Sequence, residues 1–217
     1  MPDFHQASLF PLTHPRSEDF PQFWEDIYIK NDTGWDLGGP TPIFEKLASK
    51  LEPKRLCIIG CGRGYDAVTF AKSGFDVTAV DFAPSAVKYL KNLAEEHKVK
   101  VNVLEKDIFS LSPDYKNYFD YVIEQTCFCA IHPSKRLEYE RLVHTILNTN
   151  GKLIGLWFPL DKDIKDGGPP YGTTIDEVKT IFNEGWLIEE EEFPSESIKP
   201  RKNREKLIIF KKARLLD

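Results

Sequence analysis

The sequence has few of the features that mark disulfide-bonded, metal-binding or membrane proteins. Its four cysteines, Cys57, Cys61, Cys127 and Cys129, form no C-x-x-C pair and are accompanied by no histidine cluster. We therefore expect buried, unpaired thiols in a reducing compartment and no metal site. No apolar run approaches the ~18 residues of a membrane span. The first twenty residues also lack the basic and apolar regions of a signal peptide, so we expect a cytoplasmic protein with no membrane partner.

An excess of positive charge is missing as well. The chain has 29 basic and 34 acidic residues, which gives a net charge of −5. No overall positive field attracts nucleic acid, so we expect a small-molecule or inorganic anion substrate. The 217 residues, 41% of them hydrophobic, suffice for one closed core. We predict one monomeric domain, with an N-terminal lid extension over residues 1–51 and a core over residues 52–217.

Strand and helix signals alternate through the middle and the C-terminal part. Such alternation predicts a parallel sheet with helices on both faces, which is a Rossmann-like α/β fold. The last two strands have little chain between them, so one of them can pair antiparallel in a seven-stranded mixed sheet. The predicted strands are 55–59, 76–80, 100–104, 118–123, 152–157, 186–193 and 206–211. The predicted helices are 20–30, 42–51, 66–73, 84–97, 133–147 and 174–182.

The most informative feature is a glycine-rich turn directly after the first predicted strand. The run LCIIGCGRGYD is followed by FDVTAVD, which ends on Asp81. Glycines let a backbone approach a ligand, and an acid about 20 residues later can bind ribose hydroxyls. A tight turn without a ligand is the structural alternative. Because Tyr65 and Asp66 replace the third glycine of the dinucleotide fingerprint, the motif favours a nucleoside ligand without a pyrophosphate.

Aromatic residues gather upstream of the sheet. Trp24 and Tyr28 are four residues apart and share a helix face, and Trp35 follows. Aromatic faces attract cations by ~0.5–2 kcal/mol, and an indole N–H can donate to a carboxylate. These residues predict a lid that closes over a cationic cofactor, although a lid helix that only packs on the sheet is the simpler alternative.

These motifs together resemble the thiopurine methyltransferase family, and most closely its halide/thiol methyltransferase branch. The resemblance runs from about Phe23 to Lys212. It implies a seven-stranded methyltransferase fold with an antiparallel last strand, and S-adenosyl-L-methionine as the cofactor. The segments that carry it are FWEDIYIKNDTGWDLGGPTP, IIGCGRGYDAVTFAKSGFDVTAVDFAPSAV, IEQTCFCAIHPSKRLEYERL and GGPPYGTT.

The resemblance also implies a set of cofactor contacts. They comprise the lid aromatics, the glycine turn, the ribose acid, the pair that holds the adenine, and a residue after the fourth strand. The last of these is Gln125, which departs from the arginine of thiopurine enzymes and from the tyrosine of some halide enzymes. The implied residues are Trp24, Tyr28, Trp35, Gly60, Gly62, Asp81, Asp107, Ile108 and Gln125.

Two residues are candidates for the acceptor side. Tyr171, in GGPPY, matches a tyrosine proposed to face the substrate in the halide/thiol branch, and a core-facing aromatic is the alternative. Arg136 belongs to the start of the predicted helix 133–147, near the expected substrate pocket. There it either attracts an anionic substrate or lies in solvent. His132 precedes a proline at a helix start, so we expect it to cap the helix rather than act as a base.

The candidate residues limit which acceptors a methyl group can be transferred to. Transfer of a methyl group from a sulfonium needs alignment and removal of water more than it needs stabilisation of new charge. A pocket without a strong base suits iodide, bromide, thiocyanate, hydrosulfide or an acidic thiol. Methylation of thiopurines or of tellurium or selenium species is the second hypothesis. A nucleotide-binding protein without catalysis, or an NAD-dependent oxidoreductase, is the alternative from another class.

Overall fold

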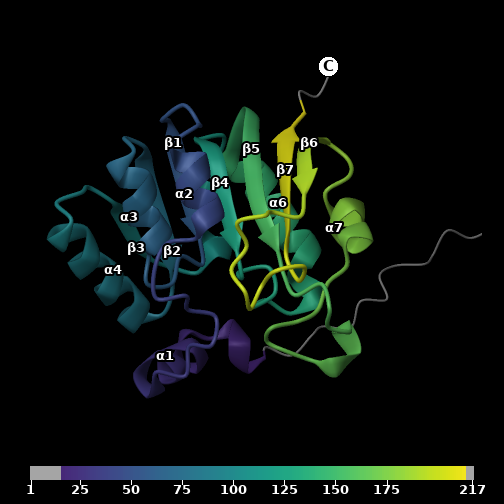
Figure 1. Cartoon of the computed structure of the whole chain (residues 1–217), viewed down its shortest axis with the longest axis horizontal. Helices are drawn as coiled ribbons and strands as arrows, with labels where there is room; N and C mark the ends of the chain where they lie inside the picture. The colour runs from purple at the N-terminus through teal and green to yellow at the C-terminus, as the bar shows by residue number, and fades with distance from the viewer. Residues whose placement is uncertain (1–15, 214–217) are drawn as a thin grey trace, which may run out of the picture.

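Seven strands form one sheet in the order β3-β2-β1-β4-β5-β7-β6 (Figure 1). The computed structural model describes residues 16–213, so the first fifteen residues of the predicted extension lie outside the described range. The strands are β1 (Arg55–Ile59), β2 (Asp76–Asp81), β3 (Asn102–Glu105), β4 (Phe119–Gln125), β5 (Leu147–Trp157), β6 (Trp186–Glu192) and β7 (Lys206–Lys212).

The direction of the strands confirms the predicted mixed sheet. Strands β1 to β5 pair parallel to their neighbours, whereas β7 runs antiparallel between β5 and β6. Parallel neighbours need crossover helices, and each βα unit of the sequence supplies one. The antiparallel strand arises because only a loop separates β6 from β7.

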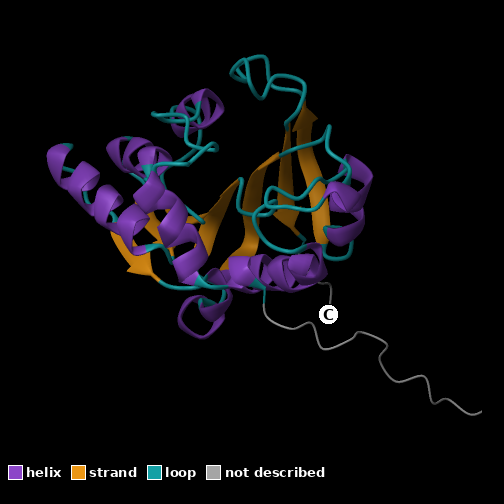
Figure 2. Ribbon diagram, turned by 90° about the horizontal axis from the view of Figure 1, so that it is seen from below, coloured by secondary structure: helices purple, strands orange, loops and turns teal. Residues whose placement is uncertain are grey.

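Helices cover both faces of the sheet (Figure 2). The seven helices within residues 16–213 are accompanied by short 3₁₀ turns. One of these turns, η1 (Ser17–Asp19), precedes the first helix. The helices are α1 (Pro21–Lys30), α2 (Pro42–Ala48), α3 (Tyr65–Lys72), α4 (Pro84–Glu96), α5 (Ser112–Tyr115), α6 (Arg136–Ile146) and α7 (Ile175–Ile181).

Strand β1 shows how one sequence serves two cores. Leu56 and Ile58 pack with helices α2, α3 and α4, whereas Cys57 and Ile59 pack with α6 and α7. Successive side chains of a strand point to opposite faces, so an unbroken apolar run is buried on both sides. The thiol of Cys57 is therefore part of the core, as the sequence predicts, and burial raises its pKa.

Several boundaries differ from the sequence-based expectation by a few residues, the start of β5 by the most. The predicted helix over 133–147 begins as a 3₁₀ turn, η3 (Pro133–Lys135), and becomes α-helical only at Arg136. Strand β5 starts at Leu147, five residues before the predicted start. The run NTNG is typical of a turn, but Leu147 pairs with the buried Phe119 of β4 and so extends the strand. Burial of an apolar side chain outweighs the local turn preference here.

The glycine turn depends on one close contact between helices. Gly64 has φ +75°, and a Cβ placed on it would lie 2.3 Å from Leu90 Cδ1 of α4. Both the left-handed backbone and the contact therefore require glycine.

We expect Gly64→Ala to lower the free energy of unfolding by about 2–4 kcal/mol, from backbone strain and overpacking. Urea denaturation measures this loss, and Gly34→Ala is the matched control because a Cβ there meets nothing within 4 Å. An equal effect of both substitutions would contradict the assignment.

Candidate functional site

A cavity of about 600 Å³ lies at the carboxyl ends of the parallel strands. Residues that end or follow four neighbouring strands line its floor: Gly60 after β1, Asp81 of β2, Asp107 after β3 and Gln125 of β4. This edge is where open α/β sheets bind ligands, because the strand order reverses next to β1. Helix α1 lies beyond the same strand ends (Figure 1) and contributes further lining residues.

The carboxylate of Asp81 joins the glycine turn to the end of β2. Its Oδ2 accepts a hydrogen bond from the Gly62 N–H at 2.8 Å, and its Oδ1 accepts one from the Ala83 N–H at 3.0 Å. Burial raises the pKa of this carboxyl, and the backbone hydrogen bonds oppose the shift. Each carboxylate oxygen can accept a second hydrogen bond. Asp81 can therefore bind two vicinal hydroxyls, as the sequence predicts for a ribose acid.

The first glycine of the turn allows a close approach to the loop that follows β4. Gly60 has φ +60°, and a Cβ on it would lie 2.9 Å from both Cβ and Sγ of Cys127. A side chain would therefore push the turn and the Cys127 loop apart at the floor of the cavity. Both predicted turn glycines, Gly60 and Gly62, line the cavity.

The three lid aromatics come together on one side of the cavity. The Trp24 and Trp35 rings meet edge to face at 5.5 Å, and the Tyr28 and Trp35 rings do so at 5.7 Å. All three residues line the cavity. The indole N–H of Trp24 donates to the backbone oxygen of Glu18 at 2.9 Å, so it is already satisfied within the lid. The rings themselves remain available to a cation.

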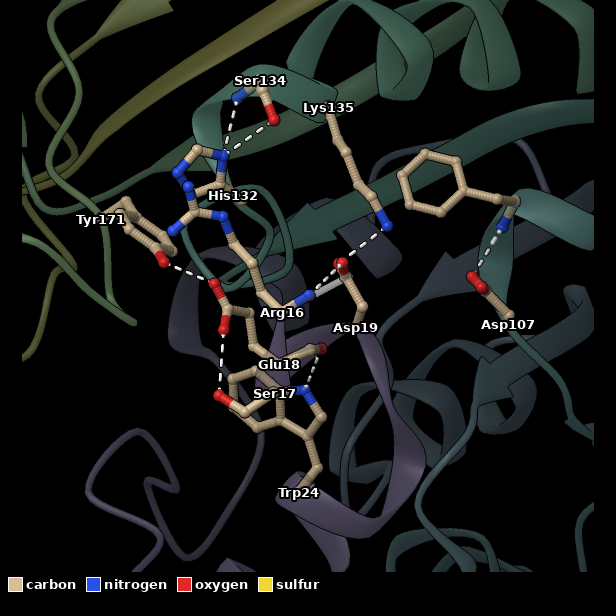
Figure 3. Close-up of polar contacts among 11 residues, drawn as sticks. Arg16, Ser17, Glu18, Asp19, Trp24, Asp107, His132, Ser134, Lys135 and Tyr171 are labelled. Carbon is tan, nitrogen blue, oxygen red and sulfur yellow. Dashed lines mark hydrogen bonds and ion pairs between the residues drawn. The ribbon is translucent and has the colours of Figure 1, made fainter. Parts of the chain in front are cut away.

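The pair expected at the adenine lies together after β3. Asp107 Oδ1 accepts a hydrogen bond from the Phe109 N–H at 3.0 Å and so caps the 3₁₀ turn η2 (Ile108–Ser110) (Figure 3). Both Asp107 and Ile108 line the cavity, and Ile108 is buried. An apolar side chain beside a carboxylate suits a planar base that carries an amino group.

A polar network missed by the sequence reasoning surrounds Gln125. The Thr41 N–H donates to Asp66 Oδ1 at 2.7 Å. The Thr41 hydroxyl lies 3.0 Å from Asp66 Oδ2 and 2.9 Å from Gln125 Oε1. A hydroxyl has one proton for these two acceptors. Burial raises the pKa of Asp66 to about 6, and protonation of Asp66 would supply the missing donor.

The other end of Gln125 lacks a partner. Its Nε2 is buried and has no hydrogen-bond acceptor among residues 16–213, although Gln125 lines the cavity. A buried amide donor without a partner is costly, so it indicates a place for a ligand atom that accepts a hydrogen bond. Gln125 and Thr41 are 84 positions apart, so the sequence contains no local signal for this network. The one available signal was Asp66, an acid in the first turn of a helix.

The segment η1 supplies two further cavity residues that sequence reasoning missed. The Tyr171 hydroxyl donates to Glu18 Oε1 at 2.5 Å, and Lys135 forms an ion pair with Asp19 at 2.7 Å (Figure 3). Glu18, Asp19 and Lys135 line the cavity, whereas Tyr171 is buried behind Glu18. Tyr171 therefore does not line the cavity itself: its hydroxyl donates to the Glu18 carboxylate, which does.

Arg136 requires a correction. It does not line the cavity, and only 1% of its surface is exposed. Its guanidinium forms an ion pair with Glu177 at 2.6 Å, donates to the Gly172 carbonyl at 3.0 Å and lies over the Phe128 ring. Neither expectation for Arg136, contact with an anionic substrate or a position in solvent, is met. The residue instead holds the loop before α7 against α6.

The prediction for His132 is confirmed. Its Nδ1 accepts a hydrogen bond from the Ser134 N–H at 3.2 Å and lies 2.8 Å from the Ser134 hydroxyl, so the imidazole caps the 3₁₀ turn η3 (Figure 3). The ring meets Tyr171 edge to face at 5.3 Å. Burial lowers the pKa of His132. The imidazole is therefore part of the wall behind Tyr171.

Across residues 16–213, no three or more His, Cys, Asp or Glu side chains are grouped so that they could hold a metal ion. In the same range, no helix combines the length and the apolar character that a membrane crossing needs.

Comparison with known proteins gives consistent matches. The model of the thiopurine S-methyltransferase family matches residues 20–214. A probable thiol methyltransferase 2 from Arabidopsis thaliana is 33% identical over 205 residues, which cover 91% of this chain and 88% of that protein. A thiocyanate methyltransferase 1 from Brassica oleracea is 32% identical and covers 87% of this chain and 84% of its own length.

A solved structure shows the same fold. The 1,6-didemethyltoxoflavin-N1-methyltransferase of Burkholderia thailandensis, determined with S-adenosylhomocysteine bound, superposes with a TM-score of 0.71. The match covers 94% of this chain and 93% of that chain at 19% identity. The likeness confirms the predicted Rossmann-like sheet with its antiparallel last strand.

The raised pKa of Asp66 has a measurable consequence for stability. The folded carboxyl titrates near 6 and an ordinary aspartate near 3.8, so the folded state holds more protons between these values. The free energy of unfolding therefore falls as pH rises through this window. We expect Asp66→Asn, which cannot titrate, to gain on the order of 2 kcal/mol relative to the parent between pH 4 and pH 7.

Urea denaturation at the two pH values, without ligand, measures this difference. Asp76→Asn is the control, because Asp76 is an exposed carboxylate at the start of β2. A constant difference between the Asp66 variant and the parent at both pH values would contradict the titration.

Proposed function

This chain belongs to the thiopurine S-methyltransferase family and is an S-adenosyl-L-methionine-dependent methyltransferase, and we propose that its acceptor is a small soft nucleophile. Halides, thiocyanate, hydrosulfide and thiols form this class. The pairing, in one cavity, of a ribose-type acid at the end of β2 with an aromatic cluster from the lid supports the methyl donor. The observation that carries the acceptor class is the apolar lining of the same cavity by Ile131, Pro169 and Pro170. When bound, the cofactor supplies an electrophilic methyl carbon on a sulfonium.

The cavity residues fit the nucleoside half of the cofactor. Asp81 has an acceptor site left on each carboxylate oxygen, which matches the two ribose hydroxyls. Asp107 and Ile108 offer a carboxylate and an apolar surface to the adenine. The rings of Trp24 and Trp35 face a compartment where a positive charge would be attracted without a counter-anion.

The network below the lid fits the amino-acid half. The orphaned Gln125 Nε2 can donate to a carboxylate, and Asp66 can accept from an ammonium group. A zwitterion needs both kinds of partner within a few ångströms. Gln125 thus fills, with a neutral amide, the place where the resemblance expects an arginine or a tyrosine. An uncharged donor suffices here because Asp66 and the ligand's own ammonium group supply the charges.

The acceptor end of the cavity supports a small and weakly hydrated nucleophile. Ile131, Pro169 and Pro170 line it with apolar surface, which favours removal of water from a soft anion or a sulfur atom. Methyl transfer to an anion neutralises charge, so the wall needs no oxyanion site. The names of the matching thiol and thiocyanate methyltransferases support the same class of acceptor.

A product screen tests the acceptor class. The protein is incubated with S-adenosyl-L-methionine and, separately, with iodide, bromide, thiocyanate, hydrosulfide, a simple alkanethiol and 6-mercaptopurine. We expect methylated products, measured by gas or liquid chromatography, from several of the first five acceptors. Turnover of 6-mercaptopurine alone would replace the proposal with the thiopurine alternative.

The ribose contact makes a separate prediction about binding. The parent is expected to bind S-adenosylhomocysteine and not NAD in titration calorimetry. Asp81→Asn is expected to weaken S-adenosylhomocysteine at least tenfold, because charge-assisted hydrogen bonds contribute about 1.5–3 kcal/mol. Asp120→Asn is the matched control, because its carboxylate also accepts a backbone N–H, from Arg55 at 3.1 Å, but lies outside the cavity. Preference for NAD would overturn the assignment of the cofactor.

A further inference from the structure

The acceptor side of the cavity contains a carboxylate that methyl transfer to an anion does not need. Glu18 is 9% exposed, lines the cavity and belongs to η1. Three contacts fix it: the Tyr171 hydroxyl donates to Oε1 at 2.5 Å, the Ser17 hydroxyl lies 3.3 Å from Oε2, and the Trp24 indole donates to its backbone oxygen. Figure 3 shows the carboxylate directed toward Tyr171, above the Trp24 indole.

We propose that Glu18 accepts the proton of acceptors that enter the site protonated, such as thiols and hydrogen sulfide, and that Tyr171 positions its carboxylate. The inference rests on the proposed function, because it concerns the same cavity and the same methyl transfer. It assigns to η1 the base that the sequence alone did not provide. It also widens the acceptor range from anions to neutral sulfur compounds.

The balance of the step is simple. The acceptor sulfur forms a bond to the methyl carbon with its own electron pair, while the bond between that carbon and the donor sulfur breaks. The S–H proton of the acceptor passes to Glu18, and the electrons of the S–H bond stay on the product thioether. The products are the methylated acceptor (a thioether from a thiol, methanethiol from hydrogen sulfide), the neutral thioether of the spent cofactor and a protonated Glu18, which then loses its proton to water. Iodide and thiocyanate carry no proton at neutral pH and leave Glu18 out of the step.

The surroundings keep Glu18 ionised and ready to accept a proton. Burial raises its pKa, but the hydrogen bonds from Tyr171 and from its own segment outweigh burial, so the pKa of Glu18 lies below its usual value. A weak base is sufficient here, because a thiol becomes strongly acidic as its sulfur gains the methyl group. The charged and titratable groups around it are Arg16 and Asp19 on its own segment, His132 and Lys135 after β4, and Tyr171 after β5.

The other candidates are less suited to this step. Asp19 already pairs with Lys135, and the His132 Nδ1 is used by Ser134. The pKa of Tyr171 is raised to about 12, first by burial and then by the hydrogen bond to Glu18, so the phenol stays protonated and donates. Asp66 lies at the opposite end of the network, beside Thr41. Among these groups only Glu18 combines a place on the cavity wall with a carboxylate that forms no ion pair within residues 16–213 and has a pKa below its usual value.

The decisive experiment compares two acceptors on one variant. At pH 7, Glu18→Gln is expected to lower kcat with an alkanethiol by roughly 100-fold, the lower end of the usual contribution of a general base. Iodide turnover is expected to fall much less, or to rise, because a negative charge has left the wall. The thiol defect should shrink as pH approaches the pKa of the thiol, since the thiolate needs no base.

The control is Asp19→Asn, which removes the same charge from the next residue of η1. It is expected to change kcat with the alkanethiol and with iodide in the same direction, and to leave the pH dependence of thiol turnover unchanged. Tyr171→Phe is expected to reproduce part of the Glu18 defect, with the same dependence on pH. S-adenosylhomocysteine affinity, measured by calorimetry, should stay within about threefold of the parent in all three variants.

A binding measurement reports on the same charge without turnover. In the complex with S-adenosylhomocysteine, Glu18→Gln is expected to bind iodide more tightly, by roughly threefold or more, because an unfavourable carboxylate–anion interaction is removed. Quenching of Trp24 and Trp35 fluorescence by bound iodide provides the signal. Unchanged or weaker binding would contradict the position of Glu18 on the acceptor wall.

The parent protein alone provides a further test. If Glu18 takes the proton, log kcat/KM for the alkanethiol should stay nearly flat from pH 6 to the pKa of the thiol. A slope of one over that range would mean that only the thiolate reacts and would overturn the proposal. Equal losses of thiol and iodide turnover in Glu18→Gln would also overturn it, leaving Glu18 as a lid contact. If the parent methylates neither acceptor, the proposed function itself fails.

Discussion

The cavity depends first on the hydrogen bonds that buried carboxylates accept from loop backbones at the carboxyl edge of the sheet. Asp81 accepts the N–H groups of Gly62 and Ala83 and so fixes the glycine turn relative to α4. Glu124, at the end of β4, accepts the N–H groups of Cys127 and Phe128 at 3.1 and 3.0 Å. Because charge-assisted bonds of this kind are short and directional, they set loop positions that packing alone leaves variable. The apolar side chains of the same loops are then free to line the cavity.

Burial of these carboxylates shifts their pKa values. Burial raises the pKa of Glu124 to about 7 and that of Asp66 to about 6, whereas Glu18 moves in the opposite direction. The difference follows from their partners and their position. Glu124, near the end of β4, and Asp66, in the first turn of α3, are deeply buried, and loss of solvent dominates their pKa values. Glu18 instead accepts hydrogen bonds that favour its charge. Acids of the same type in and beneath one cavity can therefore differ in pKa and serve different tasks.

The sequence predicted the sheet, its antiparallel strand, the glycine turn and Asp81, because each leaves a local pattern. Apolar runs, glycines and the end of a strand can all be recognised within a segment of about 25 residues. Glu18 leaves none, since a three-residue 3₁₀ turn has no periodicity and its partner Tyr171 is 153 positions away. The prediction for Arg136 was wrong for the same reason. Its ion pair with Glu177 spans 41 positions, and nothing in the helix pattern distinguishes a buried arginine from a solvated one.

The lid is tied to the core by polar contacts at separate points around the cavity. Asp36 pairs with Arg63 of the glycine turn at 2.6 Å, Asp19 pairs with Lys135, and the Trp35 carbonyl accepts from Arg201 at 2.9 Å. Arg201 belongs to the basic stretch 199–206, and its side chain is buried.

Such contacts hold a lid only when all of its ends are docked, because each one alone is worth little against solvent. The segment that carries Glu18 is held by Tyr171 and Lys135, and the segment that carries the lid aromatics is held by Arg63 and Arg201. Docking of the lid therefore brings the aromatic cluster and the Glu18 carboxylate to the cavity together. Methyl donor and proton acceptor would be assembled by the same closure, so that a nucleophile meets both or neither.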